Sequence, residues 1–362
     1  MNTFEQLMAP VWDSEIIYDE FLTMVRSNGV CEAPLLFVPE KVFLVTSADK
    51  LTEYKEGRDW VDRENMFCLT EDSRIFAFEE EQLIFEECRS EESFPTKDGK
   101  YSLFKEGHFF HDRQIAVTYK KKNGSMMFVP KFCGDMLPRT MKKLCNRETL
   151  KVVLYGDSIA AGANSSGMTL TTPFLPRWGN LFVESLRRHY NTKVELSNPS
   201  VGGKDSYWGL ANAEMKVASY KPDLAVIAFG MNDHDRGTVF AENIDRIIEC
   251  VRETSPKTEF ILCATTVPNE RVQGFYYYQD EHLEALTKIK HEGIAIADFY
   301  TMQKCLMNKK RFIDMTGNNL NHPNDFLIRC HAQLLAAMLI ENIQEYRQFQ
   351  IYQSVSDKMI CC

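Results

Sequence analysis

The pattern of apolar and polar positions changes near residue 148. Before this point, short apolar runs alternate with charged turns, which is typical of β-strands. These runs are APLLFV, KVFLVTS, SRIFAF, QLIFEE, QIAVTYK and SMMFVP. The last two flank KKNG, and Asn-Gly between two such runs predicts a β-hairpin. Residues 1–147 are therefore predicted to form a smaller, mostly-β accessory domain, sandwich-like or jelly-roll-like.

From residue 148 onward, apolar strands alternate with amphipathic helices. The predicted strands are KVVLY, KVELSN, DLAVIAF, EFILCA and GIAIAD. The predicted helices are WGNLFVESLRRHY, SYWGLANAEMKVASY, FAENIDRIIECVRETS, DEHLEALTKIK and, last, DFLIRCHAQLLAAMLIENIQEY. Continuous apolar strands separated by helices predict a parallel sheet that is covered on both faces. Residues 148–362 are therefore expected to be a flavodoxin-like, three-layer α/β/α domain with a five-stranded parallel sheet.

Composition and charge narrow the class of protein. The chain has 362 residues, of which 44% are hydrophobic and 26% charged, as in ordinary soluble proteins. A net charge of −9 argues against nucleic acid or an anionic membrane as the main partner. The N-terminus lacks a secretory signal pattern, and no apolar run approaches the length of a membrane span. The oligomeric state is left open by these data.

The cysteines and histidines show no pattern of a disulfide framework or a metal site. The eleven cysteines are an odd number and contain no C-x-x-C pair, and several lie within apolar runs. We therefore expect reduced thiols and a cytoplasmic protein. Because neither residue type has metal-ligand spacing, no metal is predicted.

Polar and glycine-containing segments follow the predicted strands. Residues 156–158 (GDS) follow the first strand, residues 198–203 (NPSVGG) the second and residues 230–233 (GMND) the third. Residues 319–323 (NLNHP) precede the last helix. Ligands bind beyond the carboxyl ends of the strands in open parallel sheets. This topology predicts that a serine, a glycine turn, an asparagine and a histidine surround one crevice.

These residue types suit acyl transfer. The hydroxyl of Ser158 needs a base to become a nucleophile, and His322 is the candidate. The backbone N–H groups of Ser158 and Gly203 and the side-chain amide of Asn232 are candidate donors to an oxyanion. Asp157 is expected to brace the turn rather than to transfer protons. Ser158 as an ordinary helix cap is the competing interpretation. A phosphate-binding loop is disfavoured because the segment lacks Gly-Lys-Ser/Thr.

Four short blocks give a more specific resemblance. GDS, NPSVGGKDS, GMND and NHPND occur in the order found in the SGNH (GDSL-type) hydrolase superfamily, over about residues 150 to 347. The resemblance implies that Ser158 is the nucleophile and His322 the base. It also implies that Ser158, Gly203 and Asn232 form the oxyanion hole and that no cofactor is required.

One position departs from the family pattern. The family usually has Asp three residues before the histidine, where this sequence has Asn319. In one interpretation Asn319 orients the imidazole, as asparagine does in papain-like proteases; in another, Asp314 or Asp325 replaces the aspartate. Alternatively, a backbone carbonyl holds the ring and leaves a Ser-His dyad. We favour Asn319 or the carbonyl over loss of activity because the other blocks are intact.

A β domain before an SGNH domain resembles carbohydrate esterases that carry a jelly-roll module and remove acetyl groups from sugars. Trp178, Tyr207, Trp208 and the run 275–278, which includes Tyr276, fit stacking against sugars. The run equally fits a hydrophobic lid or a dimer contact. We therefore expect a serine esterase, foremost a carbohydrate O-acetylesterase acting on small-molecule or oligosaccharide esters. The alternatives are a lipase-like or thioesterase activity on longer acyl chains and a catalytically inactive carbohydrate-binding protein.

Overall fold

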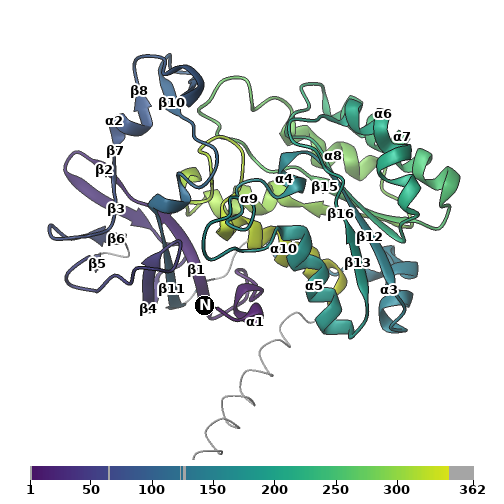
Figure 1. The fold of residues 1–362 in the computed structure, drawn as a ribbon, viewed down its shortest axis with the longest axis horizontal. Coiled ribbons are helices and arrows are strands. Elements are labelled where there is room, and N and C mark those ends of the chain that lie inside the picture. The colour runs from purple at the N-terminus through teal and green to yellow at the C-terminus, as the bar shows by residue number, and fades with distance from the viewer. Residues whose placement is uncertain (1, 64–65, 123, 125–127, 342–362) are drawn as a thin grey trace, which may run out of the picture.

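The computed structural model describes residues 2–63, 66–122, 124 and 128–341. A mostly-β N-terminal region lies beside an α/β region (Figure 1). The predicted fold class, a three-layer α/β/α domain with a five-stranded parallel sheet after a mostly-β region, is confirmed. The predicted boundary between residues 147 and 148 falls in the turn between helix α3 (Pro138–Cys145) and strand β12 (Leu150–Gly156).

A five-stranded parallel sheet forms the centre of the α/β region. Its order is β13-β12-β14-β15-β16, which is the flavodoxin-like order 2-1-3-4-5. All four pairings are parallel. The other strands are β13 (Val194–Ser197), β14 (Leu224–Ala228), β15 (Glu259–Ala264) and β16 (Ile294–Asp298). β14 and β15 are buried along their whole length because helices cover both faces of the sheet.

Two helical layers enclose this sheet. Helices α6 (Ser206–Lys216), α7 (Gly237–Thr254) and α8 (Gln279–Lys288) share one apolar cluster with alternate residues of the strands. Helices α5 (Trp178–Tyr190), α9 (Phe299–Met307) and α10 (Asp325–Leu339) share the cluster on the opposite face. The sequence did not predict α9. The predicted last helix ends earlier, at Leu339, and residues 342–346 of that prediction lie outside the described residues.

The N-terminal region consists of three small sheets. One has the order β1-β11-β4, the second β5-β6-β3-β2-β7 and the third β8-β10-β9. Two short helices, α1 (Phe4–Leu7) and α2 (Glu80–Leu83), accompany them. The strands are β1 (Ile16–Thr23), β2 (Val25–Ser27), β3 (Val30–Pro34), β4 (Pro39–Ser47), β5 (Trp60–Arg63), β6 (Met66–Leu69), β7 (Phe78–Glu79), β8 (Ile84–Phe85), β9 (Ser93–Pro95), β10 (Tyr101–Leu103) and β11 (Gln114–Lys121).

Strand β11 corresponds to the first half of the predicted hairpin. The sequence paired residues 114–120 with 125–130 across the KKNG turn, but residues 123 and 125–127 lie outside the described residues. In the structure, β11 pairs antiparallel with β1 on one side and with β4 on the other. Six consecutive residues of β11 are buried, as expected for a central strand. Its described partners are therefore distant in the sequence.

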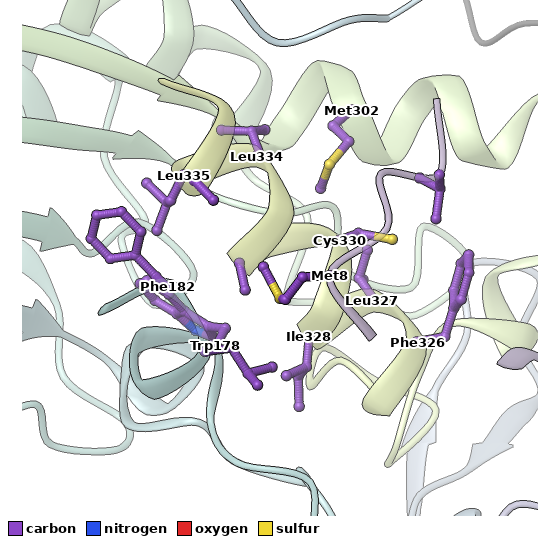
Figure 2. Packing of buried hydrophobic residues seen from close by; sticks show 14 of the residues in the cluster. Met8, Trp178, Phe182, Met302, Phe326, Leu327, Ile328, Cys330, Leu334 and Leu335 are labelled. Atoms are coloured by element: carbon purple, nitrogen blue, oxygen red, sulfur yellow. The ribbon is translucent and has the colours of Figure 1, made fainter. Parts of the chain in front are cut away.

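The two regions share one hydrophobic core. Met8 of the N-terminal region lies close to Leu327, Ile328 and Cys330 of α10 (Figure 2). A fully buried ion pair also joins the regions, with Lys310 Nζ 2.5 Å from Glu20 Oε1. The mostly-β region is thus packed directly against the α/β region.

The sequence predicts reduced thiols and contains no apolar run as long as a membrane span. The nine cysteines within the described ranges are all free. Across the same ranges, none of the helices combines the length and apolar character needed to traverse a bilayer.

Candidate active site

The turn after β12 places Ser158 at the carboxyl edge of the sheet. Asp157 caps the short helix α4 (Ser158–Ala161), because its carboxylate accepts a hydrogen bond from Ile159 N at 2.9 Å. A Cβ atom at position 156 would lie 2.0 Å from the carbonyl oxygen of Ala228, so only glycine permits this close approach of β12 and β14. Ser158 is 8% exposed and is the first residue of the helix.

Asp157 holds a second loop in addition to its own turn. Its other carboxylate oxygen accepts a hydrogen bond from Met231 N at 3.3 Å. Burial raises the pKa of Asp157 to about 7, although the N–H groups of Ile159 and Met231 act in the opposite direction. The side chain thereby connects the serine turn to the loop that carries Asn232.

The structure brings Ser158 and His322 together. Ser158 Oγ and His322 Nε2 are 2.8 Å apart, which is a hydrogen-bonding distance. His322 lies in the loop before α10, and Asn318 shapes this loop. The Oδ1 atom of Asn318 accepts backbone hydrogen bonds from Leu320, Asn321 and His322, each at 3.0 Å.

The other ring nitrogen of His322 contacts Asn164. Asn164 Oδ1 lies 2.7 Å from His322 Nδ1. The amide orientation follows from its donors, since Asn164 Nδ2 donates to the carbonyls of Gly107 at 2.8 Å and Gly317 at 3.1 Å. An acceptor at Nδ1 places the proton on Nδ1 and leaves Nε2 free to accept the hydroxyl proton of Ser158.

A carboxylate from the N-terminal region also reaches this ring. Glu106 lies 3.3 Å from His322 Nδ1, and its Oε1 atom accepts a hydrogen bond from Asn318 Nδ2 at 3.0 Å. Burial alone would raise the pKa of Glu106. The hydrogen bond and positive charge of His322, with the amides of Asn318 and Asn164, outweigh this effect and lower the pKa of the carboxyl group.

Asn319 does not contact the imidazole, which corrects the expectation that it orients His322. Its side chain donates to Ser102 Oγ at 3.2 Å and to the carbonyl of Leu103 at 2.9 Å. The residue adopts a left-handed backbone conformation, with φ of 62°, and its amide bonds to the N-terminal region instead.

The other proposed partners of the ring are also excluded. Asp314 accepts a hydrogen bond from Thr23 N at 2.8 Å, and Asp325 accepts one from Ser166 N at 2.8 Å. The contacts of His322 Nδ1 within the described residues are the side chains of Asn164 and Glu106, not a backbone carbonyl.

Besides Ser158 itself, the candidate oxyanion donors Gly203 and Asn232 lie on two neighbouring loops. A Cβ atom at Gly202 would lie 3.6 Å from Ser158 Cβ, so the glycine turn passes directly beside the serine. Gly203 has φ of 71°, which favours glycine at this position. Asn232 Nδ2 donates to the carbonyl of Lys204 at 3.1 Å and ties its loop to the same turn. Their role as oxyanion donors stays a prediction.

A polar cleft of about 400 Å³ adjoins these donors. Three carboxylates face it, and none of its lining residues is lysine or arginine. Burial raises the pKa of one of them, Asp233, to about 6. The lining residues are Gly203, Asp205, Tyr207, Asn232, Asp233, His234, Asp235, Gly274 and Phe275.

Trp178 is not a substrate-binding residue, contrary to the sequence-based expectation. Its side chain is fully buried, and Nε1 donates to the carbonyl of Ile159 at 2.7 Å. It packs beside Phe182 in the core under α10 (Figure 2). Trp178 therefore supports the serine turn from below and cannot stack against a sugar.

The other predicted aromatic residues differ in position. Tyr207 is half exposed and lines the cleft. Trp208 and Tyr276 are absent from the cleft lining, and the Tyr276 hydroxyl lies 2.8 Å from that of Tyr300. Phe275, from the same aromatic run, lines the cleft instead.

The sequence reasoning missed two residues that contact His322. Asn164 lies only six residues after Ser158, within the loop that follows the nucleophile, and its proximity was an available signal. Glu106 comes from a charged segment of the N-terminal region, where no motif marks it.

The chain is similar in sequence to known acylhydrolases and esterases. Residues 154–326 match the model of the GDSL-like Lipase/Acylhydrolase family. An arylesterase from Vibrio mimicus is 28% identical over 154 residues, which cover 41% of this chain and 70% of the arylesterase.

Solved structures of esterases are also similar. A two-domain esterase active on acetylated mannans, co-crystallized with mannopentaose, has a TM-score of 0.48 and 20% identity, covering 60% of this chain. The match covers 55% of that esterase, so the chain spans about half its length. An acetyl xylan esterase has a TM-score of 0.41 and 21% identity, covering 53% of this chain and 100% of the esterase.

Proposed function

Because the chain carries a GDSL-like lipase/acylhydrolase domain, a family within the SGNH hydrolases, we propose that it is a serine esterase that deacetylates carbohydrates. The observation that carries this proposal is the 2.8 Å contact between Ser158 Oγ and His322 Nε2. Nucleophile and base at this distance, with the base held by a third group, are the arrangement that nucleophilic catalysis requires.

The first half of the reaction forms an acyl-enzyme. Ser158 Oγ attacks the ester carbonyl carbon while His322 Nε2 accepts the hydroxyl proton. The imidazole keeps its orientation because Nδ1–H donates to Asn164 Oδ1. The negative oxygen of the tetrahedral intermediate accepts hydrogen bonds from the candidate donors Ser158 N, Gly203 N and Asn232 Nδ2. Removal of one such donor typically lowers the rate by roughly 10²- to 10³-fold.

The second half releases both products. The bond between the carbonyl carbon and the alcohol oxygen breaks, and His322 donates its proton to the departing alkoxide. Water, deprotonated by His322, then attacks the acyl-enzyme. This releases the carboxylic acid and restores the Ser158 hydroxyl. The protons balance without any cofactor.

The cleft near Ser158 supports a polar alcohol in the substrate. A separate cavity of about 10 Å³, room for about one water molecule, borders Asp157 and Ile159, and Ser158 does not line it. The cleft beside Gly203 combines carboxylates and an amide with the rings of Tyr207 and Phe275. Such a lining suits a sugar, whose hydroxyl groups bind to polar atoms and whose apolar faces stack on rings.

A covalent probe tests the nucleophile. A fluorophosphonate should label the full-length protein, and Ser158→Ala should abolish the labelling and the hydrolysis of p-nitrophenyl acetate. Ser219→Ala is the matched control, because Ser219 is exposed in the short 3₁₀ turn after α6, and this variant should react as the wild type does. A folded wild-type protein that is not labelled would instead favour a binding protein without catalysis.

A substrate panel tests the acyl group and the alcohol. Acetylated sugars and p-nitrophenyl esters of increasing chain length should show a kcat/KM that falls steeply beyond the acetyl or propionyl ester. A maximum at octanoate or longer would contradict the acetyl proposal and support a lipase-like activity.

A further inference from the structure

The N-terminal region reaches the catalytic histidine through one loop. Residues 104–113 connect β10 to β11 and pass over the loop that carries His322. Glu106 in this segment accepts from Asn318 Nδ2, and the carbonyl of the next residue, Gly107, accepts from Asn164 Nδ2 at 2.8 Å. The same few residues thus bind both groups that surround the imidazole.

We propose that Glu106 is a positioning residue of the esterase, which supplies from the mostly-β region the negative charge that the family's aspartate supplies from the histidine loop. The inference rests on the proposed function. Asn164 orients the ring, and Glu106 stabilises its charged form, so that two residues share the work of one aspartate. The hydrolytic site is then complete only when both regions are joined.

The imidazole needs an acceptor that fixes its orientation and a negative charge that stabilises its protonated form, and two different residues supply them. Nδ1 carries a single hydrogen, and Asn164 Oδ1 at 2.7 Å is the nearer acceptor. Its amide is neutral and cannot compensate the positive imidazolium that forms when Ser158 loses its proton. Glu106 at 3.3 Å acts mainly through its charge. Opposite charges at this separation attract strongly where water is partly excluded.

The surroundings leave this charge directed at His322. Lys105, the nearest residue in sequence with positive charge, forms an ion pair with Glu92. Among the described residues, the side chains within hydrogen-bonding distance of the imidazole are Ser158, Asn164 and Glu106, and only Glu106 is charged. The ionisable group that pairs with the Glu106 carboxylate is therefore His322.

Partial exposure limits the expected effect. The Glu106 side chain is 50% exposed, so water screens its charge. In the serine proteases, Asp to Asn lowers kcat about 10⁴-fold because the ring also takes the wrong tautomer. Here Asn164 keeps the tautomer after Glu106 is changed. We therefore expect Glu106→Gln to lower kcat by about 10- to 100-fold.

The test compares full-length variants on p-nitrophenyl acetate. Glu106→Gln keeps the shape of the side chain and an acceptor for Asn318, and it should lower kcat while KM changes less than about threefold, since Glu106 does not line the cleft. Glu106→Asp keeps the charge and should restore most of the loss. Glu86→Gln removes an equal charge from the bend after β8, where Glu86 pairs with Lys100, and should match the wild type.

The pH profile separates a charge effect from a structural one. Without the carboxylate, the imidazolium loses its counter-charge. The acidic limb of kcat/KM should therefore move to lower pH in Glu106→Gln and stay at its wild-type position in Glu106→Asp and Glu86→Gln. A defect of folding alone would lower the amount of active enzyme without moving this limb.

Each outcome decides the inference. Wild-type kcat and an unmoved acidic limb in Glu106→Gln would overturn the role of Glu106 and leave the esterase proposal intact. Should Glu106→Gln fail to fold, Glu106→Asp decides instead, because a kcat more than 100-fold below the wild type at an intact melting temperature contradicts a role through charge. Failure of the proposed function is recognised separately, since the wild-type protein would then neither react with fluorophosphonate nor hydrolyse any ester.

Discussion

The α/β region and the mostly-β region contribute to the site in different ways. In the α/β region, Ser158 and Asn232 lie where parallel strands end, and the topology alone brings them to one edge. In the mostly-β region, Glu106 lies in a connection between two strands of different sheets. Site residues at the carboxyl ends of parallel strands can therefore be located from the topology. A residue that comes from a loop of the neighbouring region is found only from its contacts.

A buried hydrogen-bond network around Glu20 joins the two regions. Glu20 Oε1 is bound by Lys310 Nζ at 2.5 Å and by the backbone N of Leu36 at 2.7 Å, and Tyr119 donates to Oε2 at 2.6 Å. Lys310 belongs to the α/β region, and the other three residues belong to the mostly-β region. All of these contacts are buried. A group that loses its partner here cannot form a replacement hydrogen bond to water, so breaking the network destabilises the fold.

Lys310→Met should have the largest effect on stability. It leaves Glu20 as a buried charge without its cationic partner, and breaking a buried pair in this way costs about 3–5 kcal/mol. Because the two regions share a core, both should unfold in one transition at lower urea. Intrinsic fluorescence reports this, since Trp12 and Trp60 lie in one region and Trp178 and Trp208 in the other.

Lys309→Met is the matched control for this experiment. Lys309 is the preceding residue, is exposed and lies 4.8 Å from the ring centre of Phe37. Its replacement should change stability by less than about 1 kcal/mol. Two separate unfolding transitions in the wild-type protein would show that the regions are independent and would break the comparison.

The sequence predicted the α/β region in detail for a physical reason. Its strands are continuous apolar runs and its helices are amphipathic, so each element reports its own environment. The predicted helix at residues 178–190 coincides with α5. Helix α9 was missed because it follows β16 directly, where Asp298 both ends the strand and caps the helix by accepting from Thr301 N.

Other parts of the site could not be predicted from local patterns. Trp178 was taken for a sugar-binding residue because its residue type suits both sugars and cores, and only packing distinguishes them. Asn319 stands where the family has aspartate, and its backbone conformation, which turns its amide to Leu103, is not visible in the sequence. Glu106 is separated from His322 by more than two hundred residues, and no pattern links them.

Acid sensitivity should come from the α/β region. His331 in α10 is fully buried, and neither ring nitrogen has a hydrogen-bond partner among the described residues. In the mostly-β region the buried His111 has one, since its Nε2 lies 2.8 Å from the carbonyl of Thr172. Burial lowers the pKa of His331 to about 3.

The sign of the pH effect follows from this lowered pKa. The unfolded chain protonates this histidine below about pH 6.5, whereas the folded chain does not until about pH 3. The contribution of His331 to the free energy of unfolding is therefore full above pH 6.5 and is lost as the pH falls. The loss amounts to about 2 kcal/mol at pH 5. His331→Leu should abolish this part of the loss between pH 7.5 and pH 5, measured by urea unfolding at both values.

An exposed histidine provides the comparison for this variant. His291→Leu should keep the pH dependence of the wild type, because His291 is exposed in the turn after α8. Buried carboxyls such as Asp157, whose pKa is raised to about 7, are present in all three proteins and cancel in the difference. Identical pH dependence in His331→Leu and the wild type would show that His331 does not make the α/β region acid-sensitive.

The smallest expected effect concerns the charge of the substrate. It tests whether the α/β region selects the substrate while the mostly-β region supports His322. All residues that line the cleft belong to the α/β region, and Asp205, Asp233 and Asp235 give the cleft negative potential. An acetylated hexose should therefore be hydrolysed with a kcat/KM about fivefold above that of the corresponding acetylated hexuronic acid, because Asp235 is exposed and its carboxylate repels an anion only weakly through water. Asp235→Asn should reduce this preference to about twofold, and added salt should do the same.

Glu242→Gln tests whether position, rather than net charge, decides this preference. Glu242 is exposed on α7 and is absent from the cleft lining, so its replacement removes the same charge and should leave the preference unchanged. Glu106→Gln is expected to lower kcat for both sugars by the same factor, since Glu106 acts on the histidine and not on the alcohol. A preference that follows Glu106 instead of Asp235 would mean that the mostly-β region selects the substrate as well as holding the base.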